Sequence, residues 1–313
     1  MHRTFFFLLF IMMGIGSMAQ PLAQKLQKAF QQFEADSQLR YAISSLYVVD
    51  AKTGKVLFDK NSRVGLAPAS TQKIITSVTA FELLGSDFRY KTQFWFRNFP
   101  ADSDGVLLYI KPSGDPSFGS WRWNTTKEAA VYQRLTNAIK AAGIKKINSF
   151  FVETEPWKKE SLPGGWTWQD IGNYYGAGSQ GLNWRENQYD YLLQSGKKIG
   201  DNVKVAASRP PILYHQFNDI ECLVSSAPKG TGDNAYIFLP IGNTPQLITG
   251  TIPVDESGFS ISGALVNPAA QFIGALNDSL GKGASIMSDI SFNSDTDRKF
   301  DQSVYRLFHT EIS

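Results

Sequence analysis

The most constraining feature of the sequence is an apolar helix that begins directly after a proline-containing segment. Residues 66–69 include Pro68 and predict a non-helical entry, and residues 70–84 then repeat apolar side chains at helical spacing before Gly85. The apolar stripe consists of Ile74, Val78, Phe81 and Leu84. A helix this apolar is normally covered by other elements on several sides. The chain is therefore expected to build a packed core around this helix.

The same helix opens with the pattern Ser70-x-x-Lys73. Residues three apart on a helix lie on one face, so the Lys73 amine can approach the Ser70 hydroxyl. Serine becomes a good nucleophile when a neighbouring base takes its proton, and a desolvated lysine can be that base. The helix start also favours developing negative charge. From the pattern alone, Ser70 is either a catalytic nucleophile or an N-cap serine.

The Ser-x-x-Lys pattern occurs at three further places in the chain. These are Ser195–Lys198, Ser226–Lys229 and Ser279–Lys282. None of them begins a long apolar helix, so we interpret all three as surface coincidences.

The first nineteen residues predict a signal peptide. A positive start precedes an apolar run at residues 5–15, which is too short for a spanning helix, and small residues end the segment before Gln20. An uncleaved N-terminal anchor is the alternative. We expect the mature protein to be exported from the cytoplasm, with no stable membrane span after processing.

Composition excludes several classes of function. The net charge is only +3, which gives no electrostatic footprint for nucleic acid. Cys222 is the single cysteine, so no intrachain disulfide can form. Its role is either that of a small, buried hydrophobic residue or that of a nucleophile. His215 and His309 read as surface or loop histidines. No metal-ligand spacing occurs, and we predict no metal and no cofactor.

Periodicity predicts the remaining elements in chain order. We expect a helix at 21–35, a hairpin of strands 43–49 and 55–58, strands 88–97 and 105–111, a helix at 126–142, a strand at 147–153, short strands within 200–261 and a helix at 267–280. Between them, residues 155–185 predict a glycine-rich loop. Its aromatics, Trp157, Trp166, Trp168, Tyr174 and Tyr175, line a carbohydrate or peptide surface or pack between modules.

Several segments together resemble the D-alanyl-D-alanine carboxypeptidase/endopeptidase family of low-molecular-mass penicillin-binding proteins. They are Leu66–Lys73, the hairpin segments Tyr47–Asp50 and Gly54–Phe58, Ser113–Phe118, Trp166–Asp170, Tyr174–Ala177 and Val266–Pro268. The resemblance covers the chain from about residue 40 to its end.

The resemblance implies an α+β fold: a partial penicillin-binding-protein/β-lactamase-like transpeptidase core with a large α/β and β insertion after the Ser-x-x-Lys helix. The implied domains are a signal peptide (1–19), the N-terminal part of the transpeptidase-like domain (20–85), an inserted α/β module (86–198), an inserted small β module (199–261) and an incomplete return to the transpeptidase-like domain (262–313). Gly114 and Asp115 are expected to form a structural turn.

The resemblance also implies a reaction. Ser70 attacks a D-alanine carbonyl in peptidoglycan stem peptides, Lys73 accepts its proton, and water releases the acyl-enzyme. β-Lactams would acylate Ser70 as inhibitors. Asp170 is implied to contact the amino group of a diaminopimelate side chain, with loop ordering as the alternative role.

The family's Ser-x-Asn and Lys-Thr-Gly motifs have no clear counterpart. Lys52-Thr53-Gly54 lies before the nucleophile and predicts a hairpin turn, and Ser291-Phe292-Asn293 lies in a polar stretch. Because residues 308–313 resemble the lead-in to the true Ser-x-Asn motif, we expect a truncated gene product or inactive fragment, with the apolar Ser70 helix left partly uncovered and prone to association.

Two alternative functions stay open. One is a β-lactamase-like hydrolase on the same fold. The long insertion argues against it, because β-lactamases are compact enzymes. The other is a non-catalytic peptidoglycan-binding protein with a vestigial site.

Overall fold

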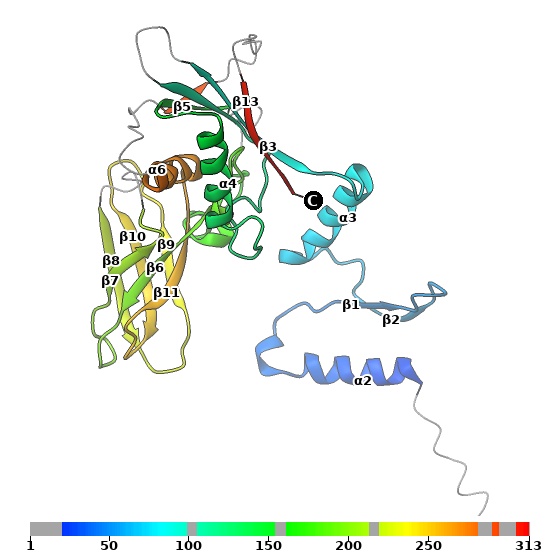
Figure 1. Cartoon of the computed structure of the whole chain (residues 1–313). Helices are drawn as coiled ribbons and strands as arrows, with labels where there is room; N and C mark the ends of the chain where they lie inside the picture. Colours follow the sequence, from blue (N-terminus) through cyan, green and yellow to red (C-terminus); the bar gives the residue numbers. More distant parts are fainter. Residues whose placement is uncertain are drawn as a thin grey trace, which may run out of the picture. The chain divides into compact units, whose positions relative to one another are not determined.

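A computed structural model of the chain describes residues 21–98, 105–153, 161–212, 219–280, 290–293 and 305–312 (Figure 1). These residues form two compact units that divide between Leu83 and Leu84. The predicted signal peptide lies outside the described residues. Within the described part of the chain, no helix is long and apolar enough to cross a membrane.

The first unit contains the predicted N-terminal helix and hairpin. Helix α2 spans Leu22–Glu34 and is followed by the short turn η1 (Ser37–Leu39), and strands β1 (Leu46–Val49) and β2 (Val56–Lys60) pair antiparallel. The rings of Phe30 in α2 and Phe58 in β2 are both buried, with their centroids 5.5 Å apart. This contact fastens α2 to the hairpin.

The turn between β1 and β2 is held by one carboxylate. Asp50 Oδ1 accepts hydrogen bonds from the backbone N–H groups of Lys52 and Thr53 and from the Thr53 hydroxyl. Gly54 follows with φ of 69°, which a glycine adopts without steric cost. Lys52-Thr53-Gly54 therefore forms the hairpin turn, as the sequence predicts.

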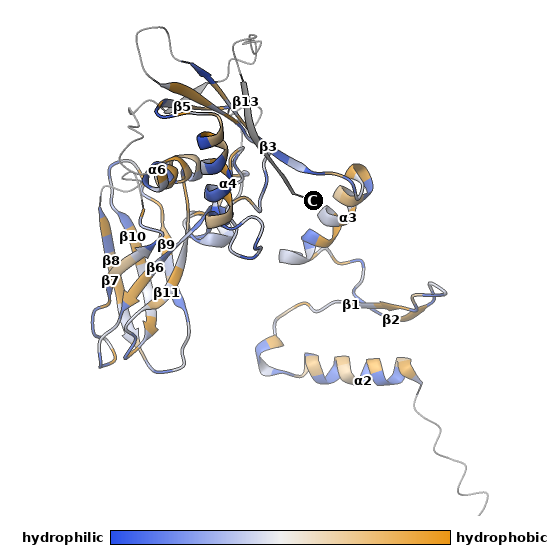
Figure 2. Cartoon of the chain, viewed as in Figure 1, coloured by the Kyte–Doolittle hydropathy of each residue, from blue (hydrophilic) through white to orange (hydrophobic). Residues whose placement is uncertain are grey.

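The apolar helix after the hairpin exposes its hydrophobic stripe. A 3₁₀ turn, η2 (Ala69–Thr71), leads into α3 (Gln72–Leu84), which carries no buried residue. Figure 2 shows the hydrophobic residues of α3 in orange. Its exposed apolar side chains are Ile74, Ile75, Val78, Phe81, Leu83 and Leu84. The several-sided cover expected for so apolar a helix is not provided by the described residues.

A five-stranded sheet dominates the second unit, in the order β12-β5-β4-β3-β13. Its strands are β3 (Tyr90–Asn98), β4 (Val106–Lys111), β5 (Ile147–Glu153), β12 (Ile290–Asn293) and β13 (Tyr305–Ile312). β3 and β4 run antiparallel, whereas β4 and β5 are parallel and are connected through α4 (Glu128–Ala141). The strands and the helix predicted between residues 88 and 153 are confirmed.

Two three-stranded sheets complete this unit. One has the order β8-β10-β9, and the other has the order β11-β6-β7. Their strands are β6 (Gln188–Gln194), β7 (Lys204–Arg209), β8 (Ile220–Ala227), β9 (Asn234–Phe238), β10 (Gln246–Pro253) and β11 (Phe259–Ala264). The short strands predicted within residues 200–261 are confirmed. β6 precedes the predicted module boundary at residue 198 but pairs with β7 and β11.

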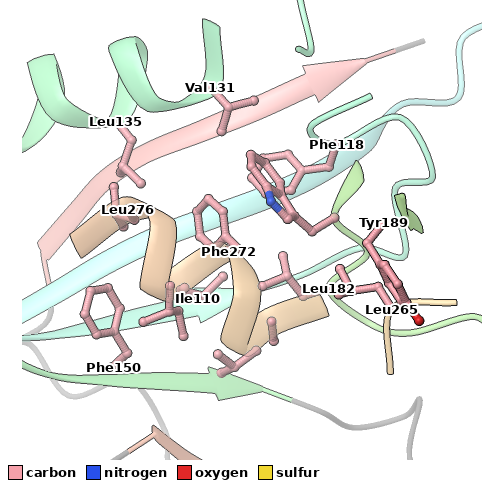
Figure 3. Packing of buried hydrophobic residues seen from close by; sticks show 14 of the residues in the cluster. Ile110, Phe118, Val131, Leu135, Phe150, Leu182, Tyr189, Leu265, Phe272 and Leu276 are labelled. Carbon is pink, nitrogen blue, oxygen red and sulfur yellow. The ribbon is translucent and has the colours of Figure 1, made fainter. Parts of the chain in front are cut away.

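Helix α6 (Pro268–Leu280) is the predicted helix near the end of the chain, and it is packed into this second unit. Its Phe272 is fully buried, and the centroid of its ring lies 4.8 Å from that of Trp184 and 5.3 Å from that of Phe118. Figure 3 shows Phe272 among buried residues that include Ile110 and Phe118. β13 pairs with β3, and β12 pairs with β5. Residues 262–313, which we expected to return to the transpeptidase-like domain, thus contribute α6, β12 and β13 to the second unit.

Candidate functional site

Ser70 and Lys73 lie next to each other at the start of α3. Ser70 is in η2, and Lys73 is in the first turn of the helix that follows. Lys73 Nζ donates a hydrogen bond to Ser70 Oγ at 2.9 Å. The turn is tied to Pro68, whose carbonyl accepts hydrogen bonds from the backbone N–H and the hydroxyl of Thr71. The spacing of the motif therefore brings the hydroxyl and the amine into direct contact.

The backbone just before Ser70 has an unusual conformation. Ala69 has φ of 45°, in the left-handed region where a residue with a side chain costs about 1–2 kcal/mol. Such outliers concentrate where a side chain must be presented in one orientation.

Both Ser70 and Lys73 are exposed, whereas a lysine that acts as a base needs desolvation.

Two of the other Ser-x-x-Lys patterns, Ser195–Lys198 and Ser226–Lys229, lie wholly within the described residues, and neither forms a serine–lysine hydrogen bond. Ser195 Oγ accepts a hydrogen bond from the Glu256 N–H, and Lys229 pairs with Asp255 at 3.0 Å. Ser226 is buried, and its hydroxyl donates to the carbonyl of Asp201. The interpretation of Ser226 as a surface residue is therefore wrong, because its hydroxyl connects strand β8 to the loop that contains Gly196 and Asp201. Lys282 lies outside the described residues.

Asp170 lies in the short helix α5 (Trp168–Ile171), within the aromatic loop of the second unit. Its Oδ2 accepts a hydrogen bond from the Thr167 hydroxyl at 2.9 Å. Burial raises the pKa of Tyr175, and the neighbouring charge of Asp170 and a hydrogen bond to it raise that pKa further. A Cβ on Gly176 would meet the Asp170 backbone carbonyl oxygen at 2.0 Å, so the loop backbone is tightly packed at Asp170.

The aromatic loop is fastened to strand β9. Asn173, which is buried, accepts a hydrogen bond from the Ile237 N–H at 3.0 Å. The Trp168 indole N–H donates to the Leu239 carbonyl at 2.8 Å, and its ring packs on Phe238. Four aromatic side chains of the loop are exposed: Trp166, Trp168, Tyr174 and Tyr175. Packing and an exposed aromatic surface, which the sequence left as alternatives, are therefore both present. Trp157 lies outside the described residues.

The Gly114–Asp115 segment is a turn, as predicted. Asp115 is buried, and its Oδ1 accepts hydrogen bonds from the backbone N–H and the hydroxyl of Ser117. The carbonyl of Gly114 accepts a hydrogen bond from the side-chain amide of Asn183.

Ser291 and Asn293 lie in β12, opposite Phe151 and Glu153 of β5, and His309 lies in β13. His215 lies outside the described residues. Cys222 is a free, half-buried cysteine whose Sγ lies 3.5 Å from the Val203 carbonyl oxygen, so it is less buried than expected. Among the described residues, no group of His, Cys, Asp and Glu side chains could hold a metal ion.

Sequence reasoning missed a polar pocket in the second unit. Its volume is 570 Å³, and its lining includes Tyr90, Ser120, Trp123, Asn183 and Glu186. The backbone around Glu186 is unusual, because residues 185–187 all have φ between 53° and 55°. No periodicity or motif marks this segment, since its conformation depends on contacts with distant parts of the chain.

Comparisons with known proteins identify a family and several relatives of this chain. The profile of the D-Ala-D-Ala carboxypeptidase 3 (S13) family matches residues 23–302. A D-alanyl-D-alanine carboxypeptidase of Actinomadura sp. (strain R39) is 23% identical over 241 residues, which are 75% of this chain and 43% of that protein. The D-alanyl-D-alanine carboxypeptidase DacB of Haemophilus influenzae is 27% identical over 48% of this chain and 30% of its own length.

Solved structures show the same fold. The crystal structure of penicillin binding protein 4 (dacB) from Haemophilus influenzae matches with a TM-score of 0.59 and 21% identity, over 82% of this chain and 54% of that one. The same protein has been solved in complex with a β-lactam, and that structure matches with a TM-score of 0.50 and 19% identity over 85% of this chain and 54% of that one. The chain spans less than half the length of the curated relatives it matches. Because the family profile matches most of its residues, this α+β chain belongs to the D-Ala-D-Ala carboxypeptidase 3 (S13) family.

Proposed function

We propose that this chain carries the nucleophile of a serine-type D-Ala-D-Ala carboxypeptidase/endopeptidase that acts on peptidoglycan stem peptides. The observation that carries the proposal is the 2.9 Å contact between Ser70 Oγ and Lys73 Nζ at the start of α3. The two other Ser-x-x-Lys patterns that lie wholly within the described residues lack such a contact. Membership of the S13 family supports the substrate class.

The proposed reaction proceeds through an acyl-enzyme. Neutral Lys73 takes the hydroxyl proton as Ser70 Oγ attacks the carbonyl carbon between two D-alanines, and the C–N bond then breaks. The proton passes to the nitrogen of the departing D-alanine. Water next attacks the ester, Lys73 takes one of its protons, and Ser70 leaves with its hydroxyl restored. The helix start favours the negative charge that develops beside it.

Asp170 is the proposed contact for the amino group on the stem peptide. Asp170 is partly exposed, and its side chain interacts with that of Tyr175, an exposed aromatic residue of the loop. Its hydrogen bond from Thr167 supports the alternative role of loop ordering. An Asp170→Asn variant separates the two roles: loss of discrimination between stem peptides with and without a free side-chain amine supports contact, whereas lost stability with unchanged discrimination supports ordering.

A β-lactam would acylate Ser70 and leave slowly. The comparison structure of penicillin binding protein 4 with a β-lactam supports this class of inhibitor. The test is labelling of the full chain with a fluorescent penicillin, followed by gel electrophoresis. Labelling of the wild type with none of the Ser70→Ala variant is expected. An unlabelled wild type, or an equally labelled variant, would contradict the assignment of Ser70.

A non-catalytic peptidoglycan-binding role is the second candidate. The exposure of Ser70 and Lys73 favours it, because a lysine that acts as a base needs a desolvated environment. Co-sedimentation with purified peptidoglycan, in the absence of penicillin labelling, would support this candidate. Rapid nitrocefin turnover would instead support a β-lactamase-like hydrolase. In each case we propose that the protein is exported to the periplasm.

A further inference from the structure

The polar pocket of the second unit is lined by neither Ser70, Lys73 nor Asp170. It is formed where β3 begins and where the loops 114–123 and 177–187 come together. Its volume of 570 Å³ falls within the range of small-molecule sites. Its lining combines hydroxyl, amide and carboxylate side chains with the apolar surfaces of Pro116 and Trp123, so it suits a ligand that has both hydrogen-bonding groups and an apolar face.

Glu186 is the charged group of this pocket. Its Oε1 accepts two hydrogen bonds, from Ser120 Oγ at 2.6 Å and from Arg122 Nε at 2.7 Å. Among the described residues, no hydrogen bond or ion pair engages its Oε2. The carboxylate is thus held in one orientation while one oxygen stays available to accept a hydrogen bond from a ligand.

The backbone that carries Glu186 is strained and well supported. Arg185, Glu186 and Asn187 form one left-handed turn, a conformation that residues with side chains rarely adopt. Arg185 N–H donates to the Phe118 carbonyl, and the Asn187 carbonyl accepts from the Leu265 N–H. Arg185 is also paired with Glu128 at the start of α4. Strain that is maintained by several long-range contacts is typical of positions where a side chain is presented for binding.

The amides of Asn183 and Asn187 shape the pocket wall. Asn183 Nδ2 donates to the Gly114 carbonyl, and Asn187 Nδ2 donates to the Gly178 carbonyl and to Asn183 Oδ1. Both side chains are buried, and their amide hydrogens are engaged within the protein. The pocket is therefore a preformed shape, which lowers the entropic cost of binding.

Trp123 adds an apolar platform at the pocket. Its ring lines the pocket while 58% of the residue remains exposed. A pyranose ring has one face of C–H groups and an edge of hydroxyl groups. Its C–H face packs on an indole, whose ring face is electron-rich, while its hydroxyls reach a fixed carboxylate.

From these features we propose that this pocket binds a sugar ring of the glycan strand, an N-acetylated hexosamine. The sugar stacks on Trp123, and its hydroxyl or acetamido N–H group donates to Glu186 Oε2. The identity of the sugar rests on the proposed function, because a peptidoglycan peptidase meets its stem peptides attached to amino sugars. Binding of the glycan here would hold the substrate on the second unit.

Isothermal titration of the full chain with tri-N-acetylchitotriose tests the proposal. The wild type is expected to bind at millimolar concentrations or tighter, and Trp123→Ala and Glu186→Gln are each expected to weaken binding at least tenfold. Glu186→Gln keeps an acceptor for Ser120 and Arg122, so the fold is preserved. Tyr41→Ala, which removes an exposed aromatic from the first unit, is the matched control and should bind as the wild type does.

Three results would overturn the proposal. They are no binding by the wild type, undiminished binding by Trp123→Ala, and tighter binding of maltotriose than of the chitotriose. Penicillin labelling of Ser70 is independent of this measurement. Saccharide binding without penicillin labelling would therefore contradict the proposed peptidase function and support the saccharide site. Labelling without saccharide binding would support the peptidase function and contradict the saccharide site.

Discussion

The Nζ of Lys73 lies 2.9 Å from the Oγ of Ser70, and both side chains are exposed. Helical spacing explains the contact, since the two residues are three positions apart at one helix start. The pair therefore presents a hydroxyl and an amine together at the surface of the first unit.

Substitution of Lys73 by arginine should abolish acylation while keeping a positive charge beside Ser70. A guanidinium does not lose its proton in proteins, so it cannot act as the base. We expect the rate of labelling by fluorescent penicillin to fall about 100-fold or more. Lys198→Arg, at the same spacing after Ser195, is the matched control. Equal loss in both variants would show that Lys73 has no special role.

The exposed stripe of α3 should drive association of the full chain. Ile74 and Phe81 are both more than half exposed, and contiguous apolar surface of this kind promotes contact between molecules. Sedimentation velocity should show larger species for the wild type than for an Ile74→Gln/Phe81→Gln double variant. Leu223→Gln, which alters an exposed apolar residue of the second unit, should leave the distribution as it is.

Gly176→Ala should destabilise the second unit. The added methyl group would meet the Asp170 carbonyl oxygen at 2.0 Å, which forces the backbone to move and costs about 1–3 kcal/mol. Urea unfolding measures the change. Gly164→Ala lies in the same loop, has open space around its Cβ position and should be neutral or slightly stabilising. Similar losses in the two variants would contradict the tight packing of the loop backbone at Asp170.

Tyr191 should make stability fall at alkaline pH. Burial raises the pKa of Tyr191 to about 12, so its neutral form is favoured in the folded state over the unfolded state. The resulting stabilisation, on the order of 2 kcal/mol, is fully present below pH 10 and is lost as the pH rises toward 12.

Tyr191→Phe tests this dependence. Tyr191 donates a hydrogen bond to Gln246, so the variant should be less stable by about 1–2 kcal/mol at pH 8. Phenylalanine does not ionise, so the variant does not lose stability by ionisation at this position. The difference in the free energy of unfolding between the variant and the wild type, measured with urea, should therefore narrow between pH 10 and 11.5. A constant difference across this range would show that Tyr191 does not ionise differently in the two states.

Phe272→Ala should be strongly destabilising. The side chain is fully buried among the rings of Phe94, Phe118 and Trp184, and removal of such a ring costs about 3–5 kcal/mol. Guanidinium unfolding measures this loss, and Leu223→Ala should change stability by less than about 0.5 kcal/mol. A small effect of Phe272→Ala would contradict the packing of α6 into the second unit.

Local elements could be predicted from the sequence to within a few residues. Apolar spacing located α2, α3, α4 and α6, and the Asp50–Gly54 turn followed from turn-forming residues between two β-branched runs. The contact between Ser70 and Lys73 was predictable for the same reason. Each of these features is built from residues within a few positions of each other.

Long-range features were not predictable in this way. Nothing in the sequence near Asn173 indicates that its side chain accepts a hydrogen bond from Ile237. The left-handed turn at residues 185–187 likewise depends on Phe118, Glu128 and Leu265.

The amino-acid sequence by itself determined the kinds of elements, their order, and the pairing of a serine with a lysine on one helical face, because helical periodicity and turn chemistry act between near neighbours. Only the tertiary structure decided that β12 and β13 join the sheet of β5 and β3, and that Glu186 is presented beside Trp123 in a polar pocket. Which strands pair and which loops meet depends on the hydrogen bonds and the burial that distant segments of the unit provide. A local sequence pattern does not contain this information.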